Sequence, residues 1–474
     1  MNVARVVVAG TSSGAGKTSV ACGLIAALRS RGHVVQGFKV GPDYIDPSYH
    51  ALASGRPGRN LDAFLSGPEL IAPLFAHGAA GADIAVIEGV MGLFDGASGR
   101  GELASTAHVA KLLDAPVLLV IDAAAMARSA AAIVHGYMTF DPDVEIAGVI
   151  VNKVGSDHHV ELLREAIEQL GVPVVGALRR DERMAAPERH LGLVPAIERE
   201  PRTRGAIDAL SAAVLSHVDL DGVVALARSS PRLAGEAWSP TSFFDEVLAS
   251  ASSGLARAST SRKDGDNGPA TIAIARGHAF SFHYEENLEL LRAAGATLAP
   301  FDPMTAPALP EHAGALILAG GFPEIFGAEL SANAPLREDI AAFARAGRPV
   351  LAECGGLLYL CEELDGLAMC GVLPARGRMA GRLSIGYREA VAQVDSALWS
   401  AGEAVRGHEF HYSAVEGDAS PAWELTARGR TRTEGFVAGA VHASYLHVHW
   451  AAFPRAARRL VAAAARQPAG ASWA

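Results

Sequence analysis

Short apolar runs alternate with amphipathic, alanine-rich stretches along the first part of the chain, from Val3 to about Pro195. The runs are rich in Val, Ile and Leu and are bounded by Gly, Pro or Asp: ARVVVAG, ADIAVIEG, APVLLVID, EIAGVIVNKV and VPVVGAL. Such runs predict strands buried on both faces, and their alternation with helices predicts a parallel α/β sheet. A second series of the same kind starts at TIAIARG and continues through GALILAGG, RPVLAECGG and GAVHASYLHVHW. The pattern therefore predicts two α/β domains.

A change of composition separates the two series. Between about Leu226 and Ala270 the chain is rich in Ser, Ala, Gly and charge, as in ASSGLARASTSRKDGDNGPA. We expect a first domain at residues 1–225, a linker at 226–270, a second domain at 271–465 and a frayed tail at 466–474. A chain of 474 residues is long enough for two cores.

Composition and charge exclude several classes of protein. Half of the residues are hydrophobic and 19% are charged, which argues against a disordered chain. The net charge of −10 argues against nucleic acid as a partner. The four cysteines lack the paired spacing of a structural zinc site, which favours a reduced, cytoplasmic setting. No apolar stretch reaches the roughly 18 residues of a membrane span, so we expect no membrane insertion.

A phosphate-binding loop is predicted where the first apolar run ends. GTSSGAGKT, residues 10–18, lies between the first predicted strand and the first predicted helix. The backbone of Gly14, Ala15 and Gly16 can surround phosphates, Lys17 can reach the outer phosphates, and the Thr18 hydroxyl can bind Mg²⁺. Gly10 lies one residue earlier than the strict motif requires, and this variant spacing resembles dethiobiotin synthetase. The motif in this context predicts nucleotide binding.

A lysine, four carboxylates and one amide lie at the ends of the predicted strands or shortly after them, at the edge of the sheet where ligands gather. The residues with this placement are Lys39, Asp43, Asp46, Glu88, Asp95 and Asn152. Phosphoryl transfer needs carboxylates to hold the metal that neutralises the developing charge. Any one of these carboxylates could instead cap a helix, and Asn152 could either bond a nucleobase edge or close a turn.

Cys354 follows an apolar run and precedes Gly355, Gly356 and a predicted helix. A strand-to-helix elbow presents its side chain at the edge of a sheet, and the helix N-terminus stabilises a thiolate, so we predict a nucleophile. Ala352 stands where the strict elbow has Gly, and is small enough for the same turn. Cys361 and Cys370 have no such context and are predicted to be core residues.

An oxyanion site and a base complete the predicted chemistry of the second domain. Gly320, Gly321 and Gly355 can offer backbone N–H groups to a tetrahedral oxyanion. Histidines that could act as the base are His408, His411, His442, His447 and His449, and spacing alone does not choose between them. The arrangement fits acyl transfer from a small amide with ammonia as the leaving group. A zinc site of Cys354, His447 and His449 is the metal alternative.

The motifs taken together resemble the cobyrinate or hydrogenobyrinate a,c-diamide synthases of corrinoid biosynthesis. The resemblance rests on GTSSGAGKTSVACGL, FKVGPDYIDPSYH, GRPGRNLDAF, VIEGVMGLFDG, GGFPE, AECGGLLYL, RGHEFHYS and ASYLHVHW. It covers nearly the whole chain. It implies a P-loop NTPase-like domain similar to dethiobiotin synthetase, followed by a class I, triad-type glutamine amidotransferase domain.

The resemblance also implies roles for individual residues. Cys354 would be the glutaminase nucleophile and His447 its base, although His449 stands where triad-type glutaminases carry Glu. Ammonia from glutamine would reach the first domain, where ATP and Mg²⁺ activate the a and c acetate carboxylates of the macrocycle as acyl phosphates. The ligase roles would fall to Thr18, Asp43 and Glu88 for Mg²⁺, Lys17 for phosphate, Asp46 and Asp95 for the reacting carboxylate, and Lys39, Tyr44, Arg56 and Arg59 for substrate.

Two rival functions remain at this stage. A regulatory P-loop ATPase would carry an extra Lys early in the loop, where Thr11 stands, and would lack the cysteine domain. A sister amidotransferase acting on another tetrapyrrole, such as nickel-sirohydrochlorin, shares the same motifs. High usage of Ala, Arg and Gly hints at a GC-rich bacterial source and so favours the cobalt-free substrate. A homodimer would be ordinary for such an enzyme, and nothing in the sequence marks an interface.

Overall fold

The computed structural model describes residues 3–180, 188–189, 192–193, 200–240, 269–418 and 420–466. The chain divides into two compact units, Met1–Trp238 and Ser239–Ala474. Most of the predicted linker and all but one residue of the predicted tail lie outside the described residues. The first unit continues beyond the expected end at residue 225, because Arg5 Nη2 donates to the Pro231 carbonyl at 2.7 Å and the Trp238 N–H donates to the Pro73 carbonyl at 3.0 Å.

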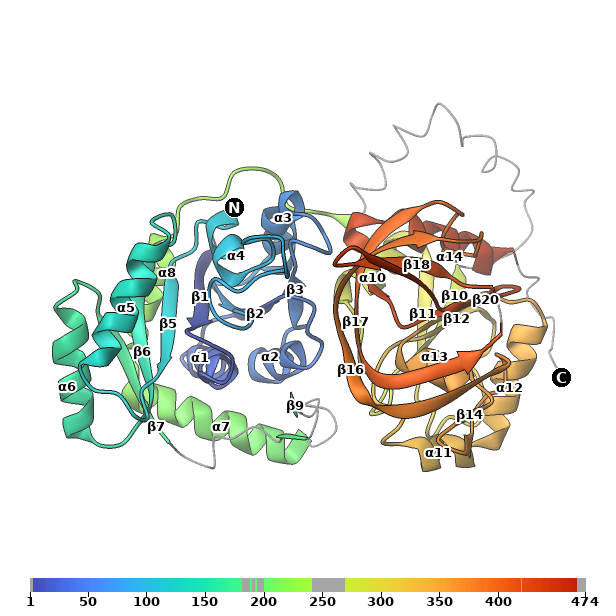
Figure 1. Ribbon diagram of the computed structural model, residues 1–474, viewed down its shortest axis with the longest axis horizontal. Helices are drawn as coiled ribbons and strands as arrows, with labels where there is room; N and C mark the ends of the chain where they lie inside the picture. Colours follow the sequence, from blue (N-terminus) through green and yellow to red (C-terminus); the bar gives the residue numbers. More distant parts are fainter. Residues whose placement is uncertain are drawn as a thin grey trace. The chain divides into compact units, whose positions relative to one another are not determined.

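The first unit contains the predicted parallel sheet (Figure 1), in the order β3-β2-β4-β1-β5-β6-β7. Its strands are β1 (Ala4–Gly10), β2 (Val35–Val40), β3 (Arg59–Leu61), β4 (Ile84–Glu88), β5 (Val117–Asp122), β6 (Ile146–Val154) and β7 (Val174–Arg179). Strands β1, β2 and β4 are fully buried apart from the first residue of β1, as continuous apolar runs require. Because β4 lies between β1 and β2, the loops after these three strands meet at one edge of the sheet.

Helices cover the first sheet. They are α1 (Lys17–Ser30), α2 (Asp46–Ser54), α3 (Pro68–Gly78), α4 (Thr106–Leu112), α5 (Ser129–Phe140), α6 (Asp157–Glu168), α7 (Glu200–His217) and α8 (Leu220–Ser229). Helices α1, α7 and α8 share one apolar core with the strands, so the helix that starts at the phosphate loop is held firmly against the sheet. Two short strands, β8 (Glu188–Arg189) and β9 (Gly192–Leu193), pair with each other.

The second unit contains a sheet in the order β11-β10-β12-β13-β21-β20, parallel except for the β20–β21 pair. Its strands are β10 (Ala270–Ala275), β11 (Ala296–Phe301), β12 (Ala313–Leu318), β13 (Val350–Glu353), β20 (Phe436–Ala438) and β21 (Val441–Ser444). The helices are α10 (Glu285–Ala293), α11 (Gly327–Ala332), α12 (Ala334–Arg345), α13 (Gly355–Leu360) and α14 (Arg455–Ala465), with a 3₁₀ turn at Trp450–Ala452.

A further, mainly antiparallel sheet belongs to the same unit, and the sequence pattern did not predict it. It comprises β14 (Glu363–Leu364), β15 (Leu367–Ala368), β16 (Ala375–Ala392), β17 (Ala404–Gly417), β18 (Trp423–Ala427), β19 (Arg430–Glu434) and β22 (His447–Val448). Strand β16 is half-exposed along most of its length and carries Arg and Gly, so it contains no apolar run. Its partner β17 also pairs with β22, which brings His408 beside His447.

Within the residues that the structure describes, every helix is too short or too polar to cross a lipid bilayer.

Candidate active sites

The phosphate loop joins β1 to α1. Gly14 and Gly16 adopt positive φ angles of 78° and 98°, which residues with a side chain rarely adopt. A Cβ atom at Gly16 would lie 2.1 Å from Nδ2 of Asn152. That Nδ2 donates a hydrogen bond to the Ala15 carbonyl at 3.0 Å, so Asn152 supports the loop from β6. This contact is neither the nucleobase contact nor the turn that the sequence suggested, and binding of a nucleobase by Asn152 stays a prediction.

Lys17 links the phosphate loop to the loop after β4. Its ammonium donates to the carbonyls of Ser12 at 3.0 Å and Met91 at 2.5 Å. Burial and the nearby charge of Lys39 lower the pKa of Lys17 to about 8, against the opposing effect of Glu88. The side chain therefore remains largely cationic near neutral pH, at the position where an outer phosphate would need a charge.

Side chains from β2, α1, α2 and β4 meet beside this loop in a charged cluster. The Lys39 ammonium lies 2.6 Å from Asp46 Oδ2 and 2.8 Å from Glu88 Oε1. The Thr18 hydroxyl donates to Glu88 Oε1 at 2.6 Å and lies 3.5 Å from Asp46 Oδ2. All four residues were predicted from the sequence, and the fold brings them into direct contact because β1, β2 and β4 end at the same edge.

Electrostatics separate the two carboxylates of the cluster. Burial disfavours the ionised form of Glu88, but the charge of Lys39 and the hydrogen bond with His50 outweigh it and lower the pKa. Burial, together with the charges of Asp43 and Glu88, raises the pKa of Asp46. Burial disfavours the Lys39 cation, yet Asp46 and Glu88 raise its pKa. Glu88 is therefore the carboxylate held ionised beside Thr18.

His50 is a member of this cluster that sequence reasoning missed. Its Nε2 lies 2.7 Å from Glu88 Oε2, and both side chains are fully buried. The signal was present in the sequence, because Asp46 and His50 are one helical turn apart and so share a face of α2.

The remaining predicted carboxylates flank the cluster. Asp43 Oδ1 accepts the N–H groups of Ile45 at 2.6 Å and Asp46 at 3.0 Å, which fixes the first turn of α2. Half-buried Tyr44 lies in the same loop. Asp95 is exposed, and its Oδ2 accepts the Gly92 N–H at 2.9 Å.

Arg56 and Arg59 contact other parts of the first unit, and their role as substrate contacts stays a prediction. The Arg56 guanidinium donates to Gln36 Oε1 at 2.8 Å and to the Ala80 carbonyl at 2.8 Å, at the start of β2 and just before β4. Arg59 begins β3, is buried, and its Cδ lies 2.5 Å from where a Cβ of Gly78 would be. The Arg56 guanidinium therefore lies at the opposite end of the sheet, whereas Arg59 pairs with Phe38, the residue before Lys39 in β2.

Cys354 forms the predicted elbow between β13 and α13. Its φ of 49° and ψ of −100° are strained for a residue with a side chain. A Cβ at Gly356 would lie 2.0 Å from the Leu318 carbonyl oxygen, so this position requires glycine. The thiol is buried, with Sγ 3.8 Å from the Phe410 carbonyl. Cys361 and Cys370 are buried as predicted, and all four cysteines are free.

The Cys354 thiol differs from the sequence prediction in one respect. Burial and the charge of Glu324 raise its pKa, and the opposing Gly355 N–H does not compensate. The helix N-terminus alone therefore does not stabilise the Cys354 thiolate enough, because the sulfur is buried away from solvent and carboxylates lie near it. A nearby base must remove the proton.

The predicted glycines and His447 surround this elbow. A Cβ at Gly355 would lie 3.1 Å from the backbone nitrogen of Gly321, so these two residues are adjacent. A Cβ at Gly320 would lie 2.5 Å from Cε1 of His447. Gly320 thus leaves room for the imidazole, and the oxyanion role of the three glycines stays a prediction.

The other candidate histidines have different surroundings. His408 Nε2 bonds the Tyr284 hydroxyl at 3.0 Å, and His411 Nδ1 lies 2.8 Å from the Ser413 carbonyl. The remaining two pack on aromatic rings, His442 on Trp423 and His449 on Tyr284. Of the five, His447 is the one against Gly320. Among the described residues no three His, Cys, Asp or Glu side chains form a metal-binding group, so the zinc alternative has no support.

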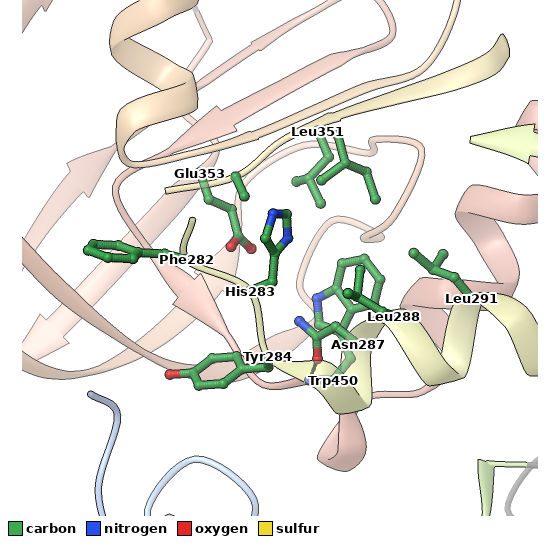
Figure 2. A pocket seen from close by; sticks show the side chains of 11 residues that line it. Phe282, His283, Tyr284, Asn287, Leu288, Leu291, Leu351, Glu353 and Trp450 are labelled. Atoms are coloured by element: carbon green, nitrogen blue, oxygen red, sulfur yellow. Dashed lines mark hydrogen bonds between the residues drawn. The ribbon is translucent and has the colours of Figure 1, made fainter. Parts of the chain in front are cut away.

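A cavity of about 20 Å³ lies beside the elbow, under α10. Phe282, His283, Tyr284, Asn287 and Trp450 line it together with Glu353. Figure 2 shows the Glu353 carboxylate pointing into this space. Glu353 Oε2 also lies 3.4 Å from Nδ1 of His447, a contact that the sequence analysis did not consider.

Comparison with known proteins identifies both domains. Residues 6–194 match the CobQ/CobB/MinD/ParA nucleotide binding domain, and residues 271–454 match the CobB/CobQ-like glutamine amidotransferase domain. The predicted fold class is therefore confirmed for both units.

Full-length relatives were also found. Hydrogenobyrinate a,c-diamide synthase of Streptomyces coelicolor is 55% identical over 97% of this chain and 97% of its own length. The protein of that name from Mycobacterium bovis is 53% identical over 98% of this chain and 99% of its own. Cobyrinate a,c-diamide synthase of Syntrophotalea carbinolica is 45% identical over 97% and 98%, respectively. The chain therefore belongs to the cobyrinate and hydrogenobyrinate a,c-diamide synthase family.

Proposed function

We propose that the protein amidates the a and c acetate carboxylates of a corrinoid precursor, using ATP and ammonia released from glutamine. The observation that carries the proposal is that one chain holds both a buried, strained cysteine elbow, with His447 against Gly320 of the neighbouring strand end, and a phosphate loop followed by a Thr18–Glu88 pair. An amide-hydrolysing site and a carboxylate-activating site are the two halves of a glutamine-dependent ligase.

In the second unit, His447 takes the proton of the Cys354 thiol as the sulfur attacks the amide carbon of glutamine. The tetrahedral oxyanion lies within reach of the N–H groups of Gly321 and Gly355. Ammonia leaves with a proton returned by His447, and water then hydrolyses the thioester to glutamate. A neutral, buried thiol fits this order, because the nucleophile is made only when the base acts.

In the first unit, the phosphate loop and Lys17 hold the triphosphate of ATP. The substrate carboxylate attacks the γ-phosphoryl group, ADP leaves, and ammonia then displaces phosphate from the acyl phosphate to form the amide. Asp46 and Asp95 would orient the reacting carboxylate, with Lys39 and Tyr44 contacting the substrate.

Magnesium fits the donor set of this site, because a hydroxyl and carboxylates are the oxygen ligands that it prefers. Thr18, Glu88 and Asp43 would hold the ion, with phosphate oxygens and water completing its coordination. When bound, Mg²⁺ neutralises charge that develops on the transferring phosphoryl group. The short Thr18–Glu88 contact of 2.6 Å is consistent with this assignment.

Within the family we favour the cobalt-free macrocycle, hydrogenobyrinate, as the substrate. The Streptomyces and Mycobacterium relatives that carry this name are more similar to the chain than the relative named for cobyrinate. Four free, buried cysteines fit a reducing compartment, which supports a cytoplasmic enzyme.

The test is mass spectrometry of the products after incubation with ATP, Mg²⁺, glutamine and, in parallel, hydrogenobyrinate, cobyrinate or nickel-sirohydrochlorin. Each amidation replaces OH by NH₂, so the amides can be counted from the mass. We expect two amides on hydrogenobyrinate. Cys354→Ser should lose glutamine-dependent but keep ammonia-dependent amidation, whereas Lys17→Ala should lose both. Equal loss of both activities in Cys354→Ser, or amidation of the nickel compound alone, would refute the proposal.

A further inference from the structure

The residue that orients His447 in the glutaminase site is still unidentified. The residue two positions after it is His449, whose ring packs 4.7 Å from that of Tyr284. His449 Nε2 lies 3.5 Å from Oε2 of Glu286, and both side chains are buried. A histidine engaged with α10 thus occupies the place of the usual acid, so the group that orients His447 must come from another element.

Glu353 comes from the strand that carries the nucleophile. It is the last residue of β13, directly before Cys354, and pairs with Ser444 in β21. Side chains alternate along a strand, so Glu353 and Leu351 share a face and line the cavity, while Ala352 joins the apolar core to which Cys354 also belongs. The strand therefore directs carboxylate and thiol to different sides of one backbone.

The His447 ring contacts Glu353 on one side and Gly320 on another. Its Nδ1 lies 3.4 Å from Glu353 Oε2, whereas its Cε1 faces Gly320. His408 stacks on it with ring centroids 5.0 Å apart and an interplanar angle of 20°. Nδ1 thus faces the carboxylate, while Cε1 and Nε2 face Gly320.

Charges around the pair favour this contact. Burial, reinforced by His447, lowers the pKa of His408, which keeps that ring neutral. His283, on the cavity side of Glu353, donates Nε2–H to the Ala275 carbonyl at 3.1 Å, and shielding from solvent lowers its pKa to about 3. Neither histidine offers a positive charge that competes for the carboxylate. The 3.4 Å separation is long for a hydrogen bond, and catalytic contacts often shorten when substrate binds.

We propose that Glu353 is a positioning residue of the glutaminase: its carboxylate accepts the Nδ1–H of His447, so that Nε2 is left to take the Cys354 proton. The carboxylate also stabilises the imidazolium that this transfer creates, without itself becoming protonated. The inference rests on the proposed function, because it presupposes that His447 is the base.

The test compares Glu353→Gln, Glu353→Asp and the control Glu286→Gln, which alters a buried carboxylate beside a different histidine of the same unit, His449. We expect Glu353→Gln to lower the kcat of glutamine hydrolysis about 10- to 100-fold. KM for glutamine should change by less than about threefold, because the group acts on the transition state and not on bound substrate. Glu353→Asp should recover part of the loss, and Glu286→Gln should remain close to wild type. Ammonia-dependent amidation, unchanged in all three, serves as the check on folding.

A second comparison separates this inference from the function on which it rests. If Glu353 acts through His447, adding Glu353→Gln to His447→Ala should cause no further loss of hydrolysis. Wild-type kcat in Glu353→Gln, or a full additional loss in the double variant, would overturn the positioning role while leaving the base assignment intact. Wild-type hydrolysis in His447→Ala alone would instead overturn the proposed glutaminase mechanism.

Discussion

The two carboxylate oxygens of Glu88 contact different partners. Oε1 faces Thr18 and Lys39, at 2.6 and 2.8 Å, whereas Oε2 faces His50 at 2.7 Å on the buried side. When a hydrogen bond fixes one oxygen of a carboxylate, the other oxygen is held in one orientation. This is the relation that outer partners have to metal ligands in other proteins. We therefore expect His50 to affect metal binding without touching nucleotide.

Replacing His50 by Ala should weaken Mg²⁺-dependent nucleotide binding by about tenfold, because Glu88 loses the bond that orients it. Calorimetric titration with the Mg²⁺ complex of ATP, and with ATP in a chelator, separates the metal-dependent part of the affinity. His135→Ala, an exposed position on α5, is the matched control. If His50→Ala binds the Mg²⁺ complex as tightly as wild type, Glu88 is not a metal-holding residue or His50 does not orient it.

Residue types at strand ends identified much of the ligase cluster from the sequence. Lys17, Thr18 and Glu88 are local to a motif or to a strand end, so their meeting follows from the order of the strands. Arg56 looked suitable by chemistry alone, but its guanidinium bonds Gln36 and Ala80 at the far end of the sheet. His50 and Glu353 act through contacts between separate elements, and a pattern along the chain does not contain such distances.

At the level of elements, the placement of α13 depends on a single glycine. The helix begins directly after Cys354 and approaches β12 so closely that a Cβ on Gly356 would lie 2.0 Å from the Leu318 carbonyl oxygen. A side chain at this position could not move away from the clash, because the backbone of β12 lies on one side and α13 on the other. The position of Cys354, and of the Gly355 N–H, therefore depends on the absence of a side chain at Gly356.

Gly356→Ala should accordingly lower glutamine hydrolysis by about 100-fold or more, since a misplacement of about 1 Å costs that much in catalysis. Ammonia-dependent amidation should persist, because the ligase unit does not contain the helix. Gly381→Ala in β16 is the control, as nothing lies within 4 Å of a Cβ there. Full glutaminase activity in Gly356→Ala would mean that the elbow adapts, contrary to the geometry.

The elements themselves were predictable to different degrees. Strands β1, β4, β5 and β6 are buried on both faces, and such burial requires the apolar runs that identified them. Strands β16 and β17 mix buried with exposed positions, with Arg378 in the first paired to Glu416 in the second. Their stability comes from pairing across the sheet and from ion pairs, neither of which leaves a continuous apolar signal.

At the scale of the whole molecule, the second unit holds groups whose titration opposes folding in acid. Burial lowers the pKa of His442 to about 4, and burial with the charge of His447 lowers that of His408 well below 6.5. Unfolded chains take up these protons near pH 6.5, so this stability is complete above that pH and is lost as the pH falls. Burial raises the pKa of Glu434 to about 7. Protonation of Glu434 therefore favours the folded state as the pH falls, and this gain in unfolding free energy offsets the loss from about one histidine.

Lowering the pH from 7 to 5 should therefore reduce the unfolding free energy of the second unit by at least about 2 kcal/mol, with partly buried His283 adding to the loss. Urea denaturation followed by tryptophan fluorescence can measure this, since Trp399, Trp423 and Trp450 are buried in that unit. His442→Gln should lose about 2 kcal/mol of the pH dependence, whereas His135→Gln should keep all of it. An unchanged pH dependence in His442→Gln would contradict the assignment, because the other titrating groups remain in that variant and only the contribution of His442 is removed.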